Sequence, residues 1–300
     1  DSITVGAGNH RFSGGANNDS LTGNGGDDTF NVDSGTDTVT DLATGDDLVV
    51  SSGATANATD ITAFVADSDT VNSGTATLTA ISSGGTIDLT SAGGSTGYTI
   101  VSGAGTDTLK GDDGNDTFTI SAAGEGNNDT IDGDAHTGGS GDTIELSTGS
   151  HTFSTDNKIL NIETIATHTS GSTVILTGQT ENFTITGNSG ADIITGGNAV
   201  DTVNAGNGND SITGGAGNDI ITGGSGNDTF NVNLGTDTIT DLSTGDDLIV
   251  SSGATATATN IASFVADSDT LNSGTANLTA RAAGGLSLIH ISEPTRPERI

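Results

Sequence analysis

The chain contains no cysteine, methionine or tryptophan, and only two prolines among its 300 residues. Without cysteine there is neither a disulfide framework nor a thiolate metal site. Aromatic residues make up 3% and hydrophobic residues 31%, which is too little for a thick globular core. No apolar run approaches the length of a membrane span, and no signal peptide opens the chain. We therefore expect a thin fold that does not insert into membranes.

Basic residues are also scarce: the chain has six basic and 39 acidic residues, for a formal net charge of -33. A compact fold with that charge repels itself. The acidity argues against nucleic acid and against anionic membrane surfaces as partners. Bound divalent cations would neutralise much of the charge, so we expect cation binding and folding to be coupled.

Glycine, in contrast, is abundant, and much of it lies in five consecutive nonapeptides over residues 187–231. They read GNSGADIIT, GGNAVDTVN, AGNGNDSIT, GGAGNDIIT and GGSGNDTFN. A plain flexible linker would not keep this register. A metal-free solenoid does not explain why the sixth residue of every repeat is acidic. The acidic positions are Asp192, Asp201, Asp210, Asp219 and Asp228, and the apolar positions two places later are Ile194, Val203, Ile212, Ile221 and Phe230.

The spacing predicts a coiled backbone with two nonapeptides in each coil. The last three residues of a repeat form a short strand whose middle side chain points inward. The first six form a turn in which glycine permits positive φ. Equivalent residues then stack every 18 positions, about 4.8 Å apart. This places Asp192, Asp210 and Asp228 in one column, and Asp201 with Asp219 in the opposite column.

The repeats resemble the G-G-x-G-x-D-x-U-x pattern of RTX (repeats-in-toxin) proteins. The resemblance implies an all-β fold, a calcium-binding parallel β-roll or β-solenoid with β-rich spacers, and several Ca²⁺ ions held by carboxylates and carbonyls. We expect ions between 192/210, 210/228 and 201/219. The last two should be best formed, since Ala199 weakens the repeat at Gly196. The implied metal ligands here are the five aspartates with Gly206, Gly208, Gly215, Gly217, Gly224 and Gly226.

Shorter runs of the same repeat lie elsewhere in the chain. Residues 14–31 supply Asp19 and Asp28 as ligands, while His10 takes the acidic position one repeat earlier. Residues 102–119 supply Asp107 and Asp116. The next two acidic positions come later than the nonapeptide spacing predicts, so we expect the inserted residues to bulge as longer turns. Calcium is less expected at those two positions, which are Asp129 and Asp142.

Residues 29–80 recur as residues 229–280, with 41 of 52 positions identical. Such duplication is typical of long tandem arrays. In the first copy, residues 36–50 resemble the strand pairs that close RTX rolls, and residues 59–66 favour one or two helical turns. Segments 71–101 and 151–186 read as strands of calcium-free coils. Their Thr-x-Thr strings suggest an ice-binding face, but their irregular spacing favours ordinary strand-forming threonine.

The final residues, 286–300, resemble a translated sequencing adapter (LSLIHISEPTR), so they are not expected to be part of the native fold. Without methionine, the chain is expected to be an internal part of a longer protein. The repeats and spacers divide it into seven segments: a partial β-roll (1–31), a spacer (32–101), an irregular second roll (102–145), a strand-rich spacer (146–186), the main roll (187–231), a truncated spacer copy (232–285) and the adapter-like tail (286–300).

The resemblance also implies a function. We expect calcium to fold a secreted repeat protein, exported by type I secretion without an N-terminal signal peptide to the outside or surface of a bacterial cell. The expected parent is an adhesin or S-layer-like array that binds a cell-surface glycan or itself, and not an enzyme. The alternative is the C-terminal RTX region of a secreted protease, lipase or polysaccharide-active enzyme. A pore-forming toxin is disfavoured, because no apolar helical segment is present.

Overall fold

The regular secondary structure of the chain is almost entirely short parallel β-strands, as the sequence predicts. The computed structural model describes residues 1–94, 96–124, 128–134 and 141–281. In these residues there are strands of two to seven residues and one 3-10 turn, η1 (Asp156–Lys158). The strands are β1 (Ser2–Thr4), β2 (Arg11–Ser13), β3 (Ser20–Thr22), β4 (Thr29–Val32), β5 (Thr36–Val39), β6 (Asp47–Val50), β7 (Thr55–Ile61), β8 (Ala63–Val65), β9 (Val71–Asn72), β10 (Thr75–Ala80), β11 (Thr86–Asp88), β12 (Gly93–Gly94), β13 (Thr99–Val101), β14 (Thr108–Lys110), β15 (Thr117–Ile120), β16 (Thr130–Asp132), β17 (Thr143–Leu146), β18 (Gly149–Thr152), β19 (Ile159–Leu160), β20 (Thr164–Ala166), β21 (Ser172–Ile175), β22 (Thr184–Thr186), β23 (Ile193–Thr195), β24 (Thr202–Asn207), β25 (Ser211–Thr213), β26 (Ile220–Ser225), β27 (Thr229–Val232), β28 (Thr236–Ile239), β29 (Asp247–Val250), β30 (Thr255–Ile261), β31 (Leu271–Asn272) and β32 (Thr275–Ala280).

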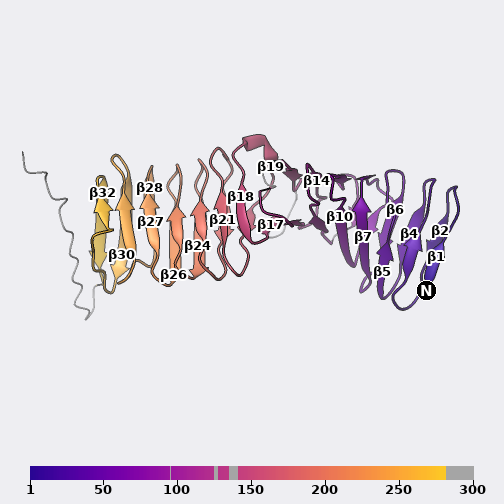
Figure 1. Cartoon of the computed structure of the whole chain (residues 1–300), viewed down its shortest axis with the longest axis horizontal. Coiled ribbons are helices and arrows are strands. Elements are labelled where there is room, and N and C mark those ends of the chain that lie inside the picture. Colours follow the sequence, from indigo (N-terminus) through magenta and orange to yellow (C-terminus); the bar gives the residue numbers. More distant parts are fainter. Residues whose placement is uncertain (95, 125–127, 135–140, 282–300) are drawn as a thin grey trace, which may run out of the picture. The chain divides into compact units, whose positions relative to one another are not determined.

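The strands belong to two compact units. Unit 1 comprises residues 1–147 and 157–164, and unit 2 comprises 148–156 and the residues from 165 onward. In unit 2 the strands alternate between two parallel sheets, so that one coil contributes one strand to each (Figure 1). The first sheet has the order β22-β24-β26-β28-β30-β32, and the second β18-β21-β23-β25-β27-β29-β31.

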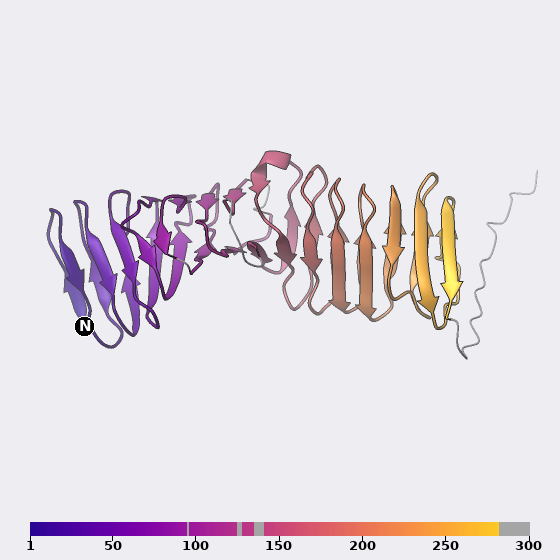
Figure 2. The same ribbon diagram turned by 180° about the vertical axis from the view of Figure 1, so that it is seen from behind.

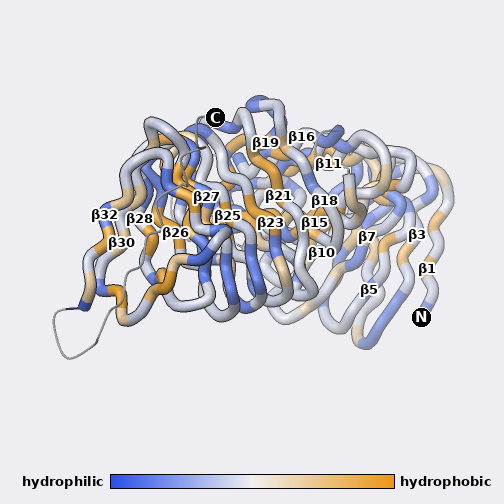
Figure 3. The backbone as a smooth tube through the Cα atoms, turned by 60° about the vertical axis from the view of Figure 1, so that its left-hand side comes forward, coloured by the Kyte–Doolittle hydropathy of each residue, from blue (hydrophilic) through white to orange (hydrophobic). Residues whose placement is uncertain are grey.

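The register in unit 2 confirms two nonapeptides per coil. Ile212 pairs with Ile194 on one side and with Phe230 on the other, so every second repeat meets its equivalent. In the opposite sheet Val203 pairs with Ile221. All five side chains are fully buried between the sheets. One inward apolar residue per nonapeptide therefore fills the narrow interior, which Figure 3 shows as hydrophobic segments along the strands.

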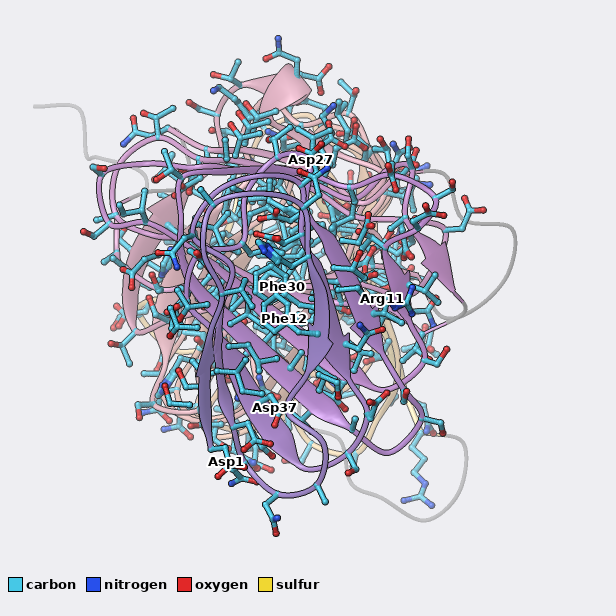
Figure 4. The ribbon with its side chains drawn as sticks, turned by 90° about the vertical axis from the view of Figure 1, so that its right-hand side faces the viewer. Asp1, Arg11, Phe12, Asp27, Phe30 and Asp37 are labelled. Carbon is cyan, nitrogen blue, oxygen red and sulfur yellow. The ribbon has the colours of Figure 1, made fainter. Side chains whose placement is uncertain are left out.

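Unit 1 is built in the same way, with a third sheet where the coils lengthen. Its sheets have the orders β1-β3-β5-β7-β10-β13-β15-β17, β2-β4-β6-β9-β12 and β8-β11-β14-β16-β19. Figure 4 looks onto the N-terminal coil, with Phe12 and Phe30 inside it. Their ring centroids lie 5.0 Å apart in an edge-to-face arrangement, a favourable geometry for aromatic pairs.

Residues 36–50 continue the stack and do not close it, contrary to the sequence-based interpretation. Strand β5 pairs with β3 and β7, and β6 pairs with β4 and β9. The reason is that the inward positions continue without a break. Val39 pairs with Leu21, and Leu48 pairs with Phe30, so each extends an existing buried column.

The helical turns predicted over 59–66 are also absent from the structure, where β7 and β8 occupy this segment. Asp60, the last residue but one of β7, adopts a φ of 60°, so the chain turns a corner and buries both Ile61 and Phe64. Phe64 pairs with Ile87 of the next coil. Strand partners in neighbouring coils thus outweigh the local helical spacing. In the second copy Asn260 has a φ of 64° at the same place.

The two copies of the duplicated segment have the same coil architecture. In copy one, Thr38 pairs with Asn57 and Asn57 with Thr77. In copy two, Thr238 pairs with Thr257 and Thr257 with Asn277. These steps are longer than two nonapeptides, so the coils lengthen gradually beyond the repeats while the strands stay in register. Segments 71–101 and 151–186 form further coils, as predicted.

The irregular run also stays in register across longer coils. Thr108 pairs with Thr130, and Thr117 pairs with Thr143, so the inserted residues do not shift the strands. The turns predicted to bulge include residues 125–127 and 135–140, which lie outside the described residues. The adapter-like tail, 286–300, also lies outside them.

Candidate metal centre

The repeat aspartates form two hydrogen-bonded columns in unit 2. The Asp192 N–H donates to Asp210 Oδ1 at 2.8 Å, and the Asp210 N–H donates to Asp228 Oδ1 at 3.0 Å. In the other column the Asp201 N–H donates to Asp219 Oδ1 at 2.8 Å. Each carboxylate thus reaches back to the coil before its own. The columns are those expected from the 18-residue stacking.

The second carboxylate oxygen is the unusual feature of these columns. In at least five of the described aspartates Oδ2 is buried and has no hydrogen-bond partner, and these side chains are at most 5% exposed. An ionised carboxylate without a partner is costly to bury, whereas a bound cation would offset that cost. These aspartates are Asp19, Asp37, Asp210, Asp219 and Asp237.

Both columns extend one coil beyond the aspartates that the repeats predict. The Asp219 N–H donates to Asp237 Oδ1 at 3.1 Å, and the Asp228 N–H donates to Asp246 Oδ1 at 3.0 Å. Unit 1 repeats this with Asp37 and Asp46, which accept from Asp19 and Asp28. The sequence analysis missed these four residues because their turns lack most of the glycines. The nine-residue spacing of aspartates would have found them.

Glycines leave room for the aspartates and for the turn carbonyls. The first glycine of a repeat lies against the aspartate of the same repeat: a Cβ on Gly223 would be 2.5 Å from Asp228 Oδ2. The six predicted glycine ligands all have positive φ, from 99° to 143°. At Gly226 a Cβ would also overlap the carbonyl of Gly208, one coil earlier. The glycines therefore let backbone carbonyls of adjacent coils approach one another.

The repeat at Gly196 differs from its neighbours, in line with its divergent sequence. Asp201 accepts from Phe183 N–H through Oδ1 and from Gly197 N–H through Oδ2, both at 2.8 Å. Each oxygen of its carboxylate therefore accepts one backbone N–H. This contrasts with Asp219 in the same column, whose Oδ2 has no partner.

In the first run His10 takes the place of an aspartate. Its Nδ1 lies 3.1 Å from Asp28 Oδ1, and its backbone N–H donates to the same oxygen at 2.8 Å. The imidazole therefore occupies the position in which the column would otherwise have a carboxylate. This fits the expectation that a site between position 10 and Asp28 lacks one carboxylate ligand.

The middle run has a column that ends in a glutamate. Asp116 accepts from the N–H groups of Tyr98 and Asp112, at 2.6 and 2.9 Å. Asp142 then accepts from Asp116, and Glu163 accepts from Asp142, both at 2.7 Å. Glu163 lies outside any nonapeptide, so no motif pointed to it. The parallel column joins the Asp107 N–H to Asp129 Oδ1 at 2.9 Å.

A different carboxylate ends the glycine turns of each duplicated copy. Asp241 accepts from Gly223 N–H at 3.0 Å and from Gly224 N–H at 2.7 Å. Asp41 makes the same pair of bonds with Gly23 and Asn24. Here a side chain satisfies turn N–H groups, so these two aspartates stabilise the end of the repeat turns.

Burial raises the pKa of the column aspartates above the ordinary value of 3.8. The pKa of Asp237 is raised to about 7, mainly by desolvation and further by the nearby Asp219. Desolvation is also the main cause at Asp116, where the pKa reaches about 7. At Asp201 and Asp228 the pKa is raised to about 6. In the metal-free coils, ionising these carboxylates near neutral pH is therefore unfavourable.

The donor set fits calcium, a hard cation that takes six to eight oxygen ligands. Carboxylate oxygens without partners and turn carbonyls lie in the same columns. Among the described residues no group of three or more His, Cys, Asp or Glu side chains is placed to hold a metal. Two carboxylates from successive coils, completed by carbonyls, are the arrangement that this backbone offers.

No described helix is long and apolar enough to cross a membrane.

Comparison with known proteins agrees with this geometry. The family model of the RTX calcium-binding nonapeptide repeat matches the chain in four copies, over residues 4–39, 99–119, 184–212 and 204–239. No curated protein matches the chain. The matched segments contain every aspartate predicted as a ligand, and nonapeptide repeats of this kind bind calcium. The chain therefore carries RTX calcium-binding nonapeptide repeats over these residues.

Proposed function

We propose that calcium ions bound between successive aspartates of each column drive the folding of this chain. The observation that carries the proposal is the buried, unpartnered Oδ2 of Asp210, Asp219 and Asp237. A divalent cation beside these oxygens would cancel buried charge in a chain of net charge -33. It would also link each coil to the next.

The proposed ligands are the aspartate pairs 192/210, 210/228 and 201/219 with the carbonyls of the turn glycines. The structure adds 219/237 and 19/37 to these, since Oδ2 is buried without a partner in both members of each pair. At 201/219, the Oδ2 of Asp201 already accepts the Gly197 N–H, whereas both Oδ2 atoms at 219/237 lack a partner. We therefore rank 219/237 above 201/219. Proposed ligands in unit 1 include Asp28, Asp107 and Asp116.

The biological role that we propose is binding and not catalysis. At low calcium the acidic repeats repel one another and stay unfolded, a state suited to export. At the higher calcium outside a cell, binding stabilises the folded coils by mass action. Proteins with these repeats are generally secreted. The long duplication, which keeps the same coil register in both copies, favours a cell-surface adhesin or S-layer-like array that contacts glycan or itself.

The alternative is the repeat region of a secreted protease, lipase or polysaccharide-active enzyme whose catalytic domain lies elsewhere. The sequence of the parent gene upstream discriminates between the two. Further copies of the duplicated unit support the array, and a compact aromatic-rich domain supports the enzyme.

The first experiment is a calcium titration followed by far-UV circular dichroism, with magnesium as the control ion. We expect calcium alone to convert coil into β-structure, and the double variant Asp210→Ala/Asp219→Ala to need more calcium. Asp33→Asn is the matched control, because Asp33 is exposed and copy two has Asn233 at that position. A β spectrum that persists unchanged in chelator would overturn the proposal.

A further inference from the structure

The outward side of one sheet of unit 2 is a regular array of uncharged hydroxyl groups. We name it the threonine face: the outward residues of β22, β24, β26, β28, β30 and β32, visible as stacked strands in Figure 2. Eleven of its sixteen alternating outward positions are threonine. The threonines are Thr184, Thr186, Thr202, Thr222, Thr236, Thr238, Thr255, Thr257, Thr259, Thr275 and Thr279, and the other positions are Asn204, Gly206, Ile220, Gly224 and Asn277.

The array is regular in space although its spacing in the sequence is not. Thr202 pairs with Thr184 on one side and with Ile220 on the other. The later steps along the sequence grow longer, yet Thr238, Thr257 and Asn277 remain in the same row. The longer coils place their extra residues elsewhere. Neighbouring rows are about 4.8 Å apart across strands and about 6.7 Å along them.

The threonine face carries no charged side chains. None of its sixteen residues is charged, in a chain with 39 acidic residues. The opposite sheet of unit 2 differs: Asp247 is outward on β29, and Ile193 and Leu271 are 51% and 53% exposed there. Strand propensity alone acts on both sheets, so it does not explain a threonine face on only one of them.

Unit 1 has a face of the same composition. From β3 to β15, the alternating outward residues of its longest sheet are threonine, serine, asparagine or valine. Charged residues are exposed on this sheet at Asp60, near the end of β7, and at Glu145 of β17. Thr22 Oγ1 and Thr40 Oγ1 lie 2.9 Å apart, as Thr222 and Thr240 do at 2.7 Å. The arrangement is therefore built twice, in both duplicated segments.

We propose that the threonine face binds ice. A periodic, uncharged solid that donates and accepts hydrogen bonds suits rows of hydroxyls with methyl groups between them. A charged surface or ionic ligand would require charges, and the face has none. An insoluble polysaccharide would require stacking aromatic rings, and no aromatic residue is outward on these strands. This function is additional to calcium binding and requires only that the coils are folded.

The test measures how much of the full chain, folded in calcium, enters a slowly growing polycrystalline ice surface. The face variant is Thr222→Tyr/Thr238→Tyr. The matched control is Thr195→Tyr/Thr213→Tyr, two threonines on adjacent strands of the opposite sheet. Tyrosine favours strands, so both variants should keep the fold, and circular dichroism verifies it. Should either double variant fail to fold, the same positions are changed to valine.

We expect the unmodified chain and the control to enter ice, and the face variant to be excluded from it. Exclusion of the folded unmodified chain from ice would overturn the proposal. Equal loss in both variants, or binding to crystalline cellulose in place of ice, would also overturn it. Since the folding transition is recorded separately, failure of ice binding is distinguishable from failure of calcium-driven folding.

Discussion

The Asp219 N–H donates to Asp237 Oδ1 at 3.1 Å, which joins an aspartate of the main repeats to a residue that the repeat pattern does not include. Both side chains are at most 1% exposed, and the Oδ2 atoms of both lack a partner. The backbone N–H favours the ionised carboxylate, but burial opposes it more strongly. This pair therefore gives the most direct tests of the calcium proposal.

The variant Asp219→Asn should have opposite effects with and without calcium. Asparagine retains an oxygen to accept the Asp201 N–H but carries no charge. In chelator we expect a higher free energy of unfolding than in the unmodified chain, because a buried charge is removed. In calcium we expect several-fold weaker binding in isothermal titration calorimetry. Asp33→Asn should change neither quantity, and a loss of stability in chelator would contradict the prediction.

Stability of the metal-free chain should fall as pH rises. The pKa of Asp237 is about 7 in the folded chain, above its ordinary 3.8, so the folded state binds protons that the unfolded state has released. This stabilisation is present below about pH 4 and is lost as pH rises through 7. Urea unfolding in chelator at pH 5 and pH 8 measures it. With calcium, binding should strengthen towards pH 8 and release protons, because the ligand is the carboxylate.

Gly226→Ala should destabilise the coils more than Gly253→Ala. Both glycines have positive φ, so each substitution costs about 1–2 kcal/mol in backbone conformation. A Cβ on Gly253 meets no atom within 4 Å, whereas one on Gly226 overlaps the Gly208 carbonyl. The difference between the two variants in denaturant unfolding reports that overlap together with the less accessible φ of Gly226, 143° against 81° at Gly253. Equal costs would show that the carbonyls of adjacent coils are not in close approach.

Ile212→Ala should lower the free energy of unfolding by about 2–5 kcal/mol, the usual cost of removing a buried branched side chain. Ile212 is fully buried between Ile194 and Phe230. The control is Ile193→Ala, since Ile193 is 51% exposed on the same sheet. The comparison is made by thermal unfolding in calcium, and similar costs for both variants would place the core elsewhere.

Asp241→Ala should loosen the end of the repeat turns without changing the aspartate columns. It leaves the N–H groups of Gly223 and Gly224 without their acceptor, at a cost of about 1–3 kcal/mol for the buried Gly223 N–H, while the exposed Gly224 N–H can turn to water. Hydrogen exchange should quicken at these two amides and remain slow at Asp210 and Asp219. Unchanged exchange at Gly223 would show that water replaces the carboxylate.

The parts of the fold that depend on the nonapeptide were predictable from sequence. The stacking of Ile194, Ile212 and Phe230 follows from periodicity alone, because one inward residue per repeat must meet its equivalent. The continuation through 36–50 was not predicted, since Val39 and Leu48 lack the glycine half of the repeat. Their partners lie one coil back, and only the assembled stack shows them.

The candidate metal ligands likewise fall into those that the repeat pattern predicts and those that only the stacked coils reveal. Aspartates inside repeats were found by motif, whereas Asp237 and Asp246 needed only the spacing of nine, without the glycines. Glu163 could not be found by either rule, because its column runs through Asp142 across coils of irregular length. The helical pattern around Ile61 and Phe64 misled for a similar reason: strand pairing between coils decided the conformation at Asp60.

The parallel strands have a mechanical consequence. Within each unit the inter-strand hydrogen bonds point from coil to coil, and so do the bonds of the aspartate columns. A pulling force along the stack therefore loads every bond of one coil interface together, and the stack parts at its weakest interface. A cation that joins two carboxylates across that interface would cross-link the two coils and resist their separation. Tensile strength in such a tether would then rise and fall with the calcium concentration around it.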